Sequence, residues 1–476
     1  MDTIVYYSSF VILTIIFVML VVLLSCRRWL IKHFSKQIGK ILLTDSYPEN
    51  IAELIPGLRH MGFQNALENN FRAQSGMLLH RPLGSSKKWP HLDSITFIPA
   101  QTSPFPIDSK EEVDVTVTIG PKAKKPLKIN IPMMISGMGY GIAVSEQVRY
   151  AMVEGAKKAG TAINSGEGGI LAAELLKAGK YILQFSRTAW AKDVELIKRA
   201  NMIEIKLGQG AVAGMGWKIP SSSLTAQVSK VLGLQIHEDA VIHETFFENQ
   251  TIAELKELVD ELRHLSGGVP IGVKIGAGGK IEEDIDHVME LGVDFIAIDG
   301  GQGGSYGAPP LLSDDMGIPT LHGIVRAAHH LKKRKMKEEI SLISSAGLYT
   351  PGHFLKMLAL GADAVYLGSS ILFAVSHKQN LQTFPFEPPT QIVWEDGKMK
   401  DQFVVAEGAK AVEKFLTSST EEIKTALRAM GKRSLKELSN KDLVSHDRLT
   451  ARMIGIPFSF EPLECTPISI RGDKNI

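Results

Sequence analysis

The chain has 476 residues, with 53 Lys and Arg against 51 Asp and Glu, so its formal net charge is only +2. This balance argues against a nucleic-acid partner, because a dominant nucleic-acid surface normally carries a strong basic excess. The hydrophobic fraction of 44% and the charged fraction of 22% are typical of a globular protein and exclude disorder of the whole chain. With only Cys26 and Cys465, the chain cannot build a disulfide framework or an all-cysteine zinc or iron–sulfur site, and we expect no metal and no iron–sulfur cluster.

The N-terminal segment from Thr3 to Cys26 contains no charged residue, and Arg27 and Arg28 follow it directly. About 20 apolar residues are enough to span a bilayer as a helix. A cleaved signal peptide fits less well, because its basic residues precede the apolar run. We predict a transmembrane anchor in residues 1–30 that crosses the membrane through residues 4–24. By the positive-inside rule, the rest of the chain is a cytoplasmic body.

Residues 31–110 show partial helical spacing and no recognisable chemistry, which predicts a connector of helices and loops. The next segment alternates apolar and polar residues from Val113 to Ile119 and again from Leu127 to Ile131. The pair Gly120-Pro121 interrupts this alternation. The pattern therefore predicts a β-hairpin.

Short apolar runs then alternate with helical patterns over about 240 residues, the usual size of a (β/α)8 barrel. The predicted strands are Met133–Ser136, Thr161–Asn164, Tyr181–Phe185, Ile203–Leu207, Ile271–Ile275, Phe295–Asp299, Ser341–Ser345 and Ala364–Leu367. The predicted helices are Ser145–Ala159, Ile252–Leu265, Ile281–Leu291, Leu321–Lys332 and Pro351–Leu360. A doubly wound open sheet is the alternative, since Gly137, Gly139 and Gly141 follow the first strand.

The predicted fold class is therefore α/β, a (β/α)8 TIM barrel with an N-terminal transmembrane helix, a preceding β-hairpin and a C-terminal helical cap. The hairpin and barrel occupy residues 111–375, and residues 376–476 form an extension that packs on the barrel. Within this extension, Thr420–Asp447 is predicted as two short helices separated near Gly431.

The strand ends carry the candidate chemistry, because catalytic groups in such barrels sit at the carboxyl ends of the strands. Glycines follow nearly every strand, and Lys206 and Lys274 close two of them. A lysine at such a position is costly unless it meets an anion or an electron-rich ligand. The structural alternative is a lysine satisfied by a neighbouring carboxylate, such as Glu204 or Glu167.

The last two strands show the layout of a phosphate site. Gly347 precedes a helix that starts at Pro351, and Gly368-Ser369 follow the last strand. Backbone N–H groups of these loops and a helix N-terminus can hold a phosphate, and glycine lets it come close. Tight turns alone are the alternative interpretation.

Taken together, these segments resemble the FMN-binding synthase domain of glutamate synthase over roughly Val113 to Ser370, and the lone barrel with an anchor is similar to stand-alone, membrane-attached members of that family. The matching segments are residues 135–141 (ISGMGYG), 164–169 (NSGEGG), 203–211 (IEIKLGQGA), 273–274 (VK) and 299–303 (DGGQG). Inosine monophosphate dehydrogenases share the phosphate layout but need a cysteine after the sixth strand, and residues 299–312 have none. The 2-hydroxy-acid oxidases also share it, but this chain lacks their Arg-x-His-Gly segment.

The resemblance implies a flavin-dependent oxidoreductase acting on CH–NH2 donors, with FMN as cofactor and a role in glutamate biosynthesis. In that family, reduced flavin passes a hydride to 2-iminoglutarate, formed from 2-oxoglutarate and ammonia, to give glutamate. The residues implied to act on the substrate are Lys206, Gln209, Glu167 and Arg187. The residues implied to bind FMN are Ser136, Gly137, Met138, Ser165, Lys274, Gly300, Gly301, Gly303, Ala346, Gly347, Gly368 and Ser369.

The departures from the family shape the functional prediction. Residue 1 is Met1 rather than a glutamine-hydrolysing cysteine, and residues 375–378 lack the cysteines that hold an iron–sulfur cluster. We therefore expect a separate electron donor and an external ammonia source. Residues 242–247 also differ from the family, which favours an alternative: an FMN oxidoreductase for a different amino or oxo acid, coupled to a membrane or ferredoxin-like electron partner. An inactive membrane-tethered barrel scaffold is the alternative from another class.

Overall fold

The computed structural model describes residues 2–248 and 250–461. The chain divides into two compact units, Met1–Leu79 and His80–Ile476. The second unit contains the barrel and begins about thirty residues before the predicted hairpin, so residues 80–110 fold with the body.

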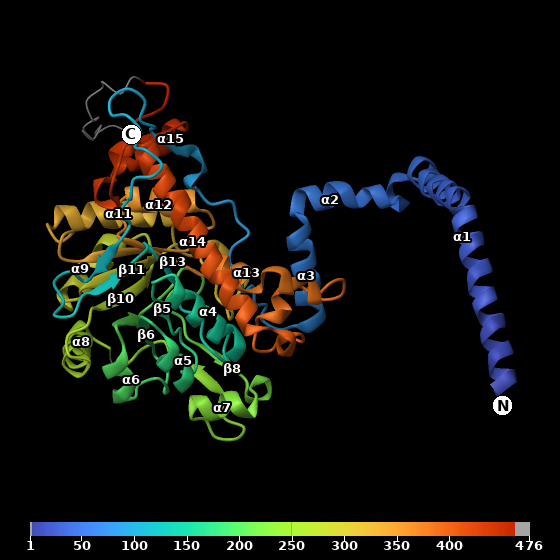
Figure 1. Ribbon diagram of the computed structural model, residues 1–476, viewed down its shortest axis with the longest axis horizontal. Coiled ribbons are helices and arrows are strands. Elements are labelled where there is room, and N and C mark those ends of the chain that lie inside the picture. The colour runs from blue at the N-terminus through green and yellow to red at the C-terminus, as the bar shows by residue number, and fades with distance from the viewer. Residues whose placement is uncertain (1, 249, 462–476) are drawn as a thin grey trace. The chain divides into compact units, whose positions relative to one another are not determined.

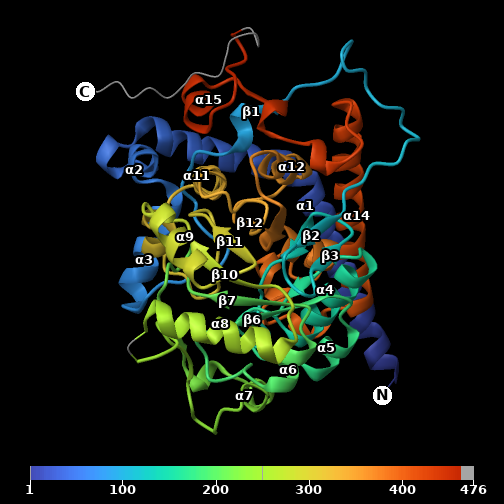
Figure 2. The ribbon, with the colours of Figure 1, turned by 90° about the vertical axis from the view of Figure 1, so that its left-hand side faces the viewer.

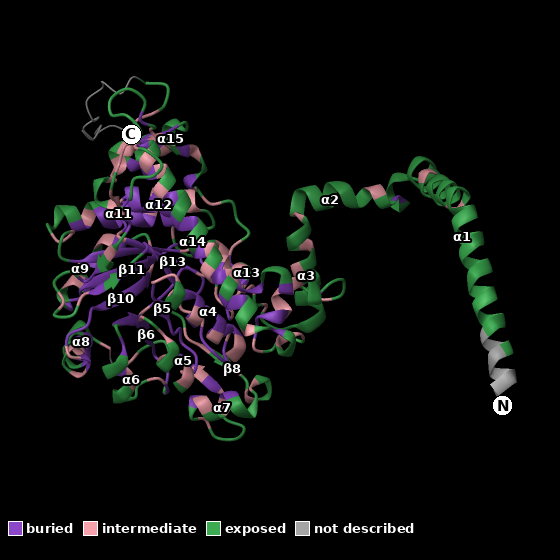
Figure 3. Ribbon diagram, in the orientation of Figure 1, coloured by how far each residue is buried: buried purple, intermediate pink, exposed green. Residues whose placement is uncertain are grey.

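The first unit is helical. Helix α1 (Asp2–Thr44) is followed by α2 (Leu54–Met61) and α3 (Phe63–Ser75). The part of α1 from Phe10 onward is long and apolar enough to cross a membrane, the one such helix among the described residues, and its apolar side chains are exposed (Figure 3). Helix α1 continues well beyond residue 30, the predicted end of the anchor, because the basic residues after Cys26 do not interrupt its helical backbone.

The second unit is built on a closed barrel of eight parallel strands, which confirms the predicted fold and excludes the open sheet (Figures 1 and 2). In barrel order the strands are β4 (Met133–Ile135), β5 (Ile163–Asn164), β6 (Tyr181–Phe185), β7 (Met202–Lys206), β10 (Ile271–Gly276), β11 (Phe295–Asp299), β12 (Ser341–Ser345) and β13 (Ala364–Leu367). Every residue of β4 to β7 and of β11 to β13 is buried, as expected for a parallel sheet covered by helices.

The predicted hairpin is present as β2 (Val117–Ile119) paired with β3 (Leu127–Ile129). Its apolar side chains pack with inward-facing barrel residues such as Met134 and Phe295. The backbone N–H of Gly120 donates to Ser341 Oγ, at the start of β12, over 3.0 Å. The hairpin therefore closes the amino-terminal end of the barrel and leaves the carboxyl end for a ligand.

Helices surround the barrel. They are α4 (Glu146–Lys158), α5 (Ala172–Lys177), α6 (Val194–Arg199), α8 (Ile252–Ser266), α9 (Ile281–Glu290), α10 (Pro310–Asp315), α11 (Thr320–Lys333), α12 (Pro351–Ala359) and α13 (Ser369–Ser376). The five predicted ones, α4, α8, α9, α11 and α12, lie within a residue or two of their predicted bounds, because their apolar faces repeat with the helical period, whereas α5, α6, α10 and α13 were not predicted. Between β7 and β10 the chain inserts β8 (Trp217–Ile219), α7 (Ala226–Leu232) and β9 (Ala240–Ile242), with β8 and β9 paired antiparallel.

The predicted pair of short helices over Thr420–Asp447 is wrong. One long helix, α14 (Val405–Ala429), packs against α4 and α13, and Gly431, which follows shortly after its end, has a positive φ. The residues after it form β14 (Leu443–Ser445), which pairs with β1 (Ile95–Phe97), and then α15 (Arg448–Ile454). Residues 443–445 form a strand and not a helix, because β1 supplies a strand edge for them to pair with. The pairing joins Ile95 to Ser445, so the sequence near Gly431 gives no sign of it.

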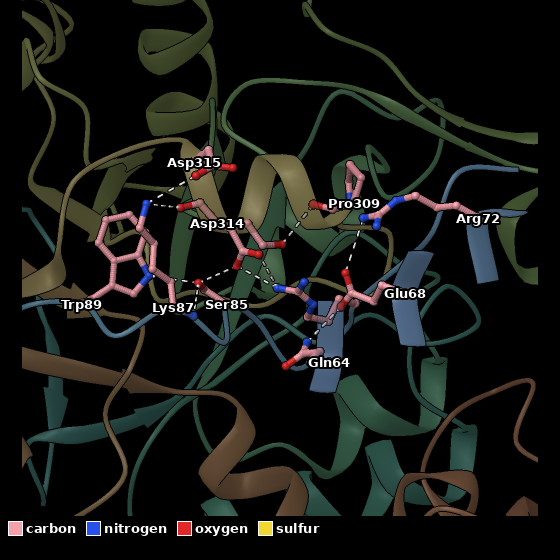
Figure 4. Close-up of polar contacts among 11 residues, drawn as sticks. Gln64, Glu68, Arg72, Ser85, Lys87, Trp89, Pro309, Asp314 and Asp315 are labelled. Atoms are coloured by element: carbon pink, nitrogen blue, oxygen red, sulfur yellow. Dashed lines mark hydrogen bonds and ion pairs between the residues drawn. The ribbon is translucent and has the colours of Figure 1, made fainter. Parts of the chain in front are cut away.

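Segment 80–89 is held on the barrel by polar contacts with α10. The carboxylate of Asp314 accepts from Arg81 Nη1 and from Ser85 Oγ, each at 2.7 Å, and the Asp314 carbonyl accepts from Lys87 Nζ at 3.1 Å (Figure 4). The indole N–H of Trp89 donates to Ser85 Oγ at 3.0 Å. These contacts place the segment beside the loops that follow β11.

Candidate functional site

Two lysines lie side by side at the carboxyl end of the barrel. Lys206 ends β7 and is in register with Lys274 of β10. Lys206 forms an ion pair with Glu167, from the loop after β5, and Lys274 Nζ lies 3.3 Å from Asp299 Oδ2 at the end of β11. All four side chains are buried. The alternative interpretation, in which a neighbouring carboxylate satisfies the lysine, therefore applies in part, because each lysine has a carboxylate partner.

The pKa values of the two lysines are shifted in opposite directions. Burial lowers the pKa of Lys206, although Glu167 opposes this, and the neighbouring Lys274 lowers it further. Burial also acts on Lys274, but Asp299 and Glu204 outweigh it and raise the pKa of that lysine. Lys206 is therefore the group that exchanges a proton more easily, while Lys274 is held as a fixed cation.

A polar network beneath the lysines positions the loop after β5. Glu204 Oε1 accepts from Asn164 Nδ2 at 2.9 Å and from Gln184 Nε2 at 2.7 Å. Asn164 Oδ1 in turn accepts from the N–H of Gly166 at 2.9 Å. Gly166 has φ +70°, a conformation that suits glycine, and the turn directs Glu167 toward Lys206. The network thus aims the carboxylate of Glu167 into the barrel mouth.

Arg187 follows β6 and lies near Glu167, and one nitrogen of its guanidinium binds the protein itself, while its buried Nε has no partner among the described residues. Its Nη1 donates to the carbonyl of Gly214, at 2.7 Å, and to that of Glu244. Burial lowers the pKa of Arg187, against the carboxylates of Glu167 and Glu244. Arg187 therefore ties the inserted segment around Glu244 to the barrel.

Gly210 makes the closest loop contact in this part of the site. A Cβ at Gly210 would overlap the carbonyl oxygen of Gly300, so the loops after β7 and β11 can meet only through glycine. We expect Gly210→Ala to displace the adjacent Gln209 and to lower turnover about a hundredfold, as expected for a misplacement of order 1 Å. Gly278→Ala, where the nearest atom is 3.9 Å away, should leave turnover unchanged in the same steady-state assay. Equal turnover of both variants would contradict the packing argument.

Lys206, Lys274, Glu167 and Asp299 line an open cavity at the mouth of the barrel. Two of the polar atoms on its lining residues are buried and have no hydrogen-bond partner among the described residues: Glu167 Oε1 and Gln302 Nε2. Buried polar groups are rarely left unpaired, because each costs about 1–3 kcal/mol. A ligand with several polar groups therefore fits this cavity.

One end of the cavity has the geometry of an anion cradle. Ala346 and Gly347 both have positive φ, +84° and +68°, and the Gly347 N–H donates no hydrogen bond among the described residues. A Cβ at Gly368 would point into open space, and α13 begins directly after it at Ser369. Such amides and a helix N-terminus suit a phosphate group.

The structure brings most of the predicted site residues to this cavity. Those that line it are Ser136, Gly137, Met138, Glu167, Lys206, Gln209, Lys274, Gly303, Ala346, Gly347, Gly368 and Ser369. Four lie outside the lining: Arg187, Ser165, Gly300 and Gly301.

The hydrogen bonds of Gly300, Gly301 and Ser165 within the protein explain why these three residues do not line the cavity. The amide of Gly300 donates to the Ser345 carbonyl and that of Gly301 to the Ile318 carbonyl, so both are occupied within the protein. Ser165 Oγ accepts from the Gln184 amide at 2.9 Å and thereby joins β5 to β6. We therefore base the phosphate site on Gly347, Gly368 and Ser369.

Sequence reasoning did not select several lining residues. Gln302 Oε1 accepts from Thr320 N and Oγ1, both at 2.8 Å, and its amide nitrogen is buried without a partner among the described residues. Gln302 lies within the DGGQG segment and could have been chosen. Tyr306 bonds to Asp396 and packs edge-on against Trp394, with ring centroids 5.5 Å apart. No sequence signal connects these two aromatic residues, because they meet only through the fold of the C-terminal extension.

Comparison with known proteins gives a consistent result. The family described as "Conserved region in glutamate synthase" matches residues 84–433. A glutamate synthase large subunit-like protein of Rhizobium meliloti (strain 1021) is 29% identical over 409 residues, covering 81% of this chain and 91% of the relative. An archaeal glutamate synthase (NADPH) of Methanocaldococcus jannaschii is 27% identical over 432 residues, covering 84% and 83%. A solved flavocytochrome b2 with pyruvate bound aligns with a TM-score of 0.48 at 17% identity, over 79% of this chain and 84% of that one.

Proposed function

The chain belongs to the glutamate synthase family and is a flavin-dependent oxidoreductase, and on that premise we propose that it reduces a 2-imino acid, of the 2-iminoglutarate type, to the corresponding amino acid. In this reaction a 2-oxo acid and ammonia condense with loss of water, and the C=N bond then takes up a hydride and a proton. The observation that supports the proposal is the pair of buried lysine–carboxylate contacts, Lys206 with Glu167 and Lys274 with Asp299, at the mouth of the barrel.

The cavity fits FMN by its unpartnered polar atoms and its anion cradle. In this proposal Gly347, Gly368 and Ser369 would hold the phosphate, and residues 136–138 and Lys274 would hold the rest of the cofactor. FMN bound there would supply the hydride chemistry of the reaction. Lys274, held charged by Asp299, would stabilise negative charge on the cofactor.

The chain's own residues prepare the substrate. Lys206 can donate a proton to the substrate nitrogen or its carbonyl oxygen, because its proton is the more easily released of the two lysines. Glu167 Oε2 accepts from Lys206, and its Oε1, which has no partner among the described residues, can accept from an amino or imino N–H of the substrate. Gln209, buried beside Lys206 in the lining, orients the substrate through its amide.

One observation favours the second candidate, an FMN oxidoreductase for a different amino or oxo acid. The carboxylate clamp implied by the family resemblance includes Arg187, and in this chain Arg187 Nη1 binds the carbonyls of Gly214 and Glu244. Glu244 lies in the segment that departs from the family. The residue that holds the distal carboxylate of 2-oxoglutarate is then a different one, or the substrate lacks that group.

An anaerobic visible spectrum distinguishes the candidates. The purified full chain is reduced chemically, and 2-oxoglutarate with ammonium is then added. Return of the oxidised flavin band supports glutamate formation. A flavin that stays reduced with 2-oxoglutarate but reoxidises with another 2-oxo acid supports the second candidate. A protein that takes up no flavin contradicts the proposed function and supports the scaffold.

The lowered pKa of Lys206 has a consequence for the pH dependence of the reaction. The charged form is the proton donor, so activity is present at low pH and is lost as pH rises through the lowered pKa. The alkaline limb of kcat/KM is therefore expected below the ordinary lysine value of about 10.4. In Glu167→Gln the opposing carboxylate is absent, so the limb should move to still lower pH. A limb unchanged by this substitution would show that another group titrates.

We also propose that α1 anchors the chain in a membrane with the barrel on the cytoplasmic side. The apolar run from Phe10 and the basic residues at its carboxyl end support this orientation. A protein extracted by alkaline carbonate without detergent, or a barrel protected from protease in sealed inside-out vesicles, contradicts the proposal.

A further inference from the structure

A second cluster of chemically active side chains lies outside the cavity lining. His91 and Asp93 come from the segment before β1, and His353 comes from the first turn of α12. One donor atom from each residue lies within 4.8 Å of the other two. From this geometry we propose a divalent transition-metal site, of the zinc type, with His91 Nδ1, Asp93 Oδ1 and His353 Nε2 as protein ligands.

The orientation of His91 supports ligation through Nδ1. Its other nitrogen, Nε2, lies 2.7 Å from the carbonyl oxygen of Gly347, so Nε2 carries the proton and Nδ1 presents its lone pair. Metal-ligating histidines almost always donate their second N–H to a carbonyl or carboxylate in this way. The Nδ1 lone pair faces Asp93 Oδ1 at 4.0 Å.

His353 completes the set from the other side. Its Nε2 lies 3.6 Å from Asp93 Oδ1, and its ring meets the ring of His91 edge-on with centroids 4.6 Å apart. Ligands about 2.0–2.2 Å from a zinc ion are separated by roughly 3.3–3.6 Å in a tetrahedral site, so the three donors, which lie within 4.8 Å of one another, need to approach by about 1.5 Å or less. Nδ1 of His353 accepts a long hydrogen bond of 3.4 Å from the Tyr349 N–H, and ligation through Nε2 moves the ring proton to Nδ1 at the expense of that contact.

The exposure and charge of the three side chains suit a metal ion that also binds water. The side chains of His91 and His353 are only 16% and 14% exposed, whereas that of Asp93 is 87% exposed. The ring nitrogens are thus held by the fold while the carboxylate can move to close on the ion. Lys356 is the nearby cation, and its Nζ is directed to the Leu92 carbonyl at 2.9 Å. Two imidazoles and one carboxylate are a ligand set that suits zinc and related ions.

The proposed site has a structural consequence for the anion cradle. An ion there joins residues 91–93 to α12, and His91 is bonded directly to Gly347. We infer that metal binding stiffens the Gly347 turn. This inference does not depend on the identity of the substrate, and it can be tested in the protein without flavin.

The test is a calorimetric titration of the chelator-treated full chain with Zn²⁺, together with thermal unfolding and the visible spectrum of the Co²⁺ form. We expect one ion per chain, a higher Tm with Zn²⁺, and Co²⁺ bands of a four- or five-coordinate site. Asp93→Asn, an exposed change that leaves the core intact, should weaken binding at least about tenfold, and His353→Gln at least as much.

Matched controls are His264→Gln and Asp401→Asn, exposed residues of the same types elsewhere on the body, which should bind Zn²⁺ as the unaltered chain does. Absence of a one-to-one binding event overturns the proposal. Binding that is equal in the unaltered chain, Asp93→Asn and His353→Gln also overturns it, because the ion then sits elsewhere.

Discussion

Replacing Lys206 with methionine is expected to lower turnover by roughly a thousandfold, the largest effect on activity of any single change considered. Lys206 is buried beside the cavity, is paired with Glu167 and lies next to Lys274. Methionine keeps the length and the apolar stem but removes the proton and the charge, and losses of about 10²–10⁴ follow removal of a proton donor or an electrostatic stabiliser. Steady-state turnover with the best 2-oxo acid and ammonium measures the effect.

The control must separate chemistry from folding, because removing one partner of a buried ion pair leaves an uncompensated charge. The double variant Lys206→Met with Glu167→Gln removes that charge and should recover stability without recovering turnover. Lys218→Met, at an exposed lysine of β8, should retain full turnover. If folded Lys206→Met turns over substrate at nearly the rate of the unaltered chain, Lys206 has no catalytic role.

The largest effect on stability is expected from Arg149→Met, with a loss of about 3–5 kcal/mol in the free energy of unfolding. Arg149 on α4 is fully buried and pairs with Glu174 on α5 through two nitrogens, Nε at 3.2 Å among them. Its Nη1 also donates to the carbonyls of Met138, at 2.8 Å, and Asn164, at 3.1 Å. Methionine leaves the carboxylate and both carbonyls without this donor. Urea unfolding monitored by circular dichroism gives the change.

Arg199→Met provides the matched control, because Arg199 is exposed at the end of α6 and its loss should change stability by less than about 0.5 kcal/mol. Adding Glu174→Leu to Arg149→Met should restore part of the lost free energy of unfolding. The double-mutant cycle built from these variants gives the coupling energy between Arg149 and Glu174. Since Arg149 joins the loops that follow β4 and β5, weaker retention of flavin should accompany the loss. A loss below about 1 kcal/mol would show that the pair is replaceable.

Much of the barrel follows from local pattern. The strands Tyr181–Phe185, Phe295–Asp299, Ser341–Ser345 and Ala364–Leu367 have their predicted bounds, because short apolar runs between helical repeats can only be strands of a covered parallel sheet. The carboxyl ends of such strands meet at one end of the barrel, so Lys206, Lys274 and Gly347 were predicted at the same site. The hairpin before β4 was also visible as an alternation.

What the sequence alone determined is therefore the set of barrel elements, the end at which chemistry occurs and the family. The tertiary structure decided which groups remain free to act. Arg187 is engaged by the carbonyls of Gly214 and Glu244, Gly300 and Gly301 have occupied amides, and His91 meets His353 across more than 250 residues. The physical reason is that a side chain's partners are set by distance in space, whereas periodicity reports only neighbours along the chain.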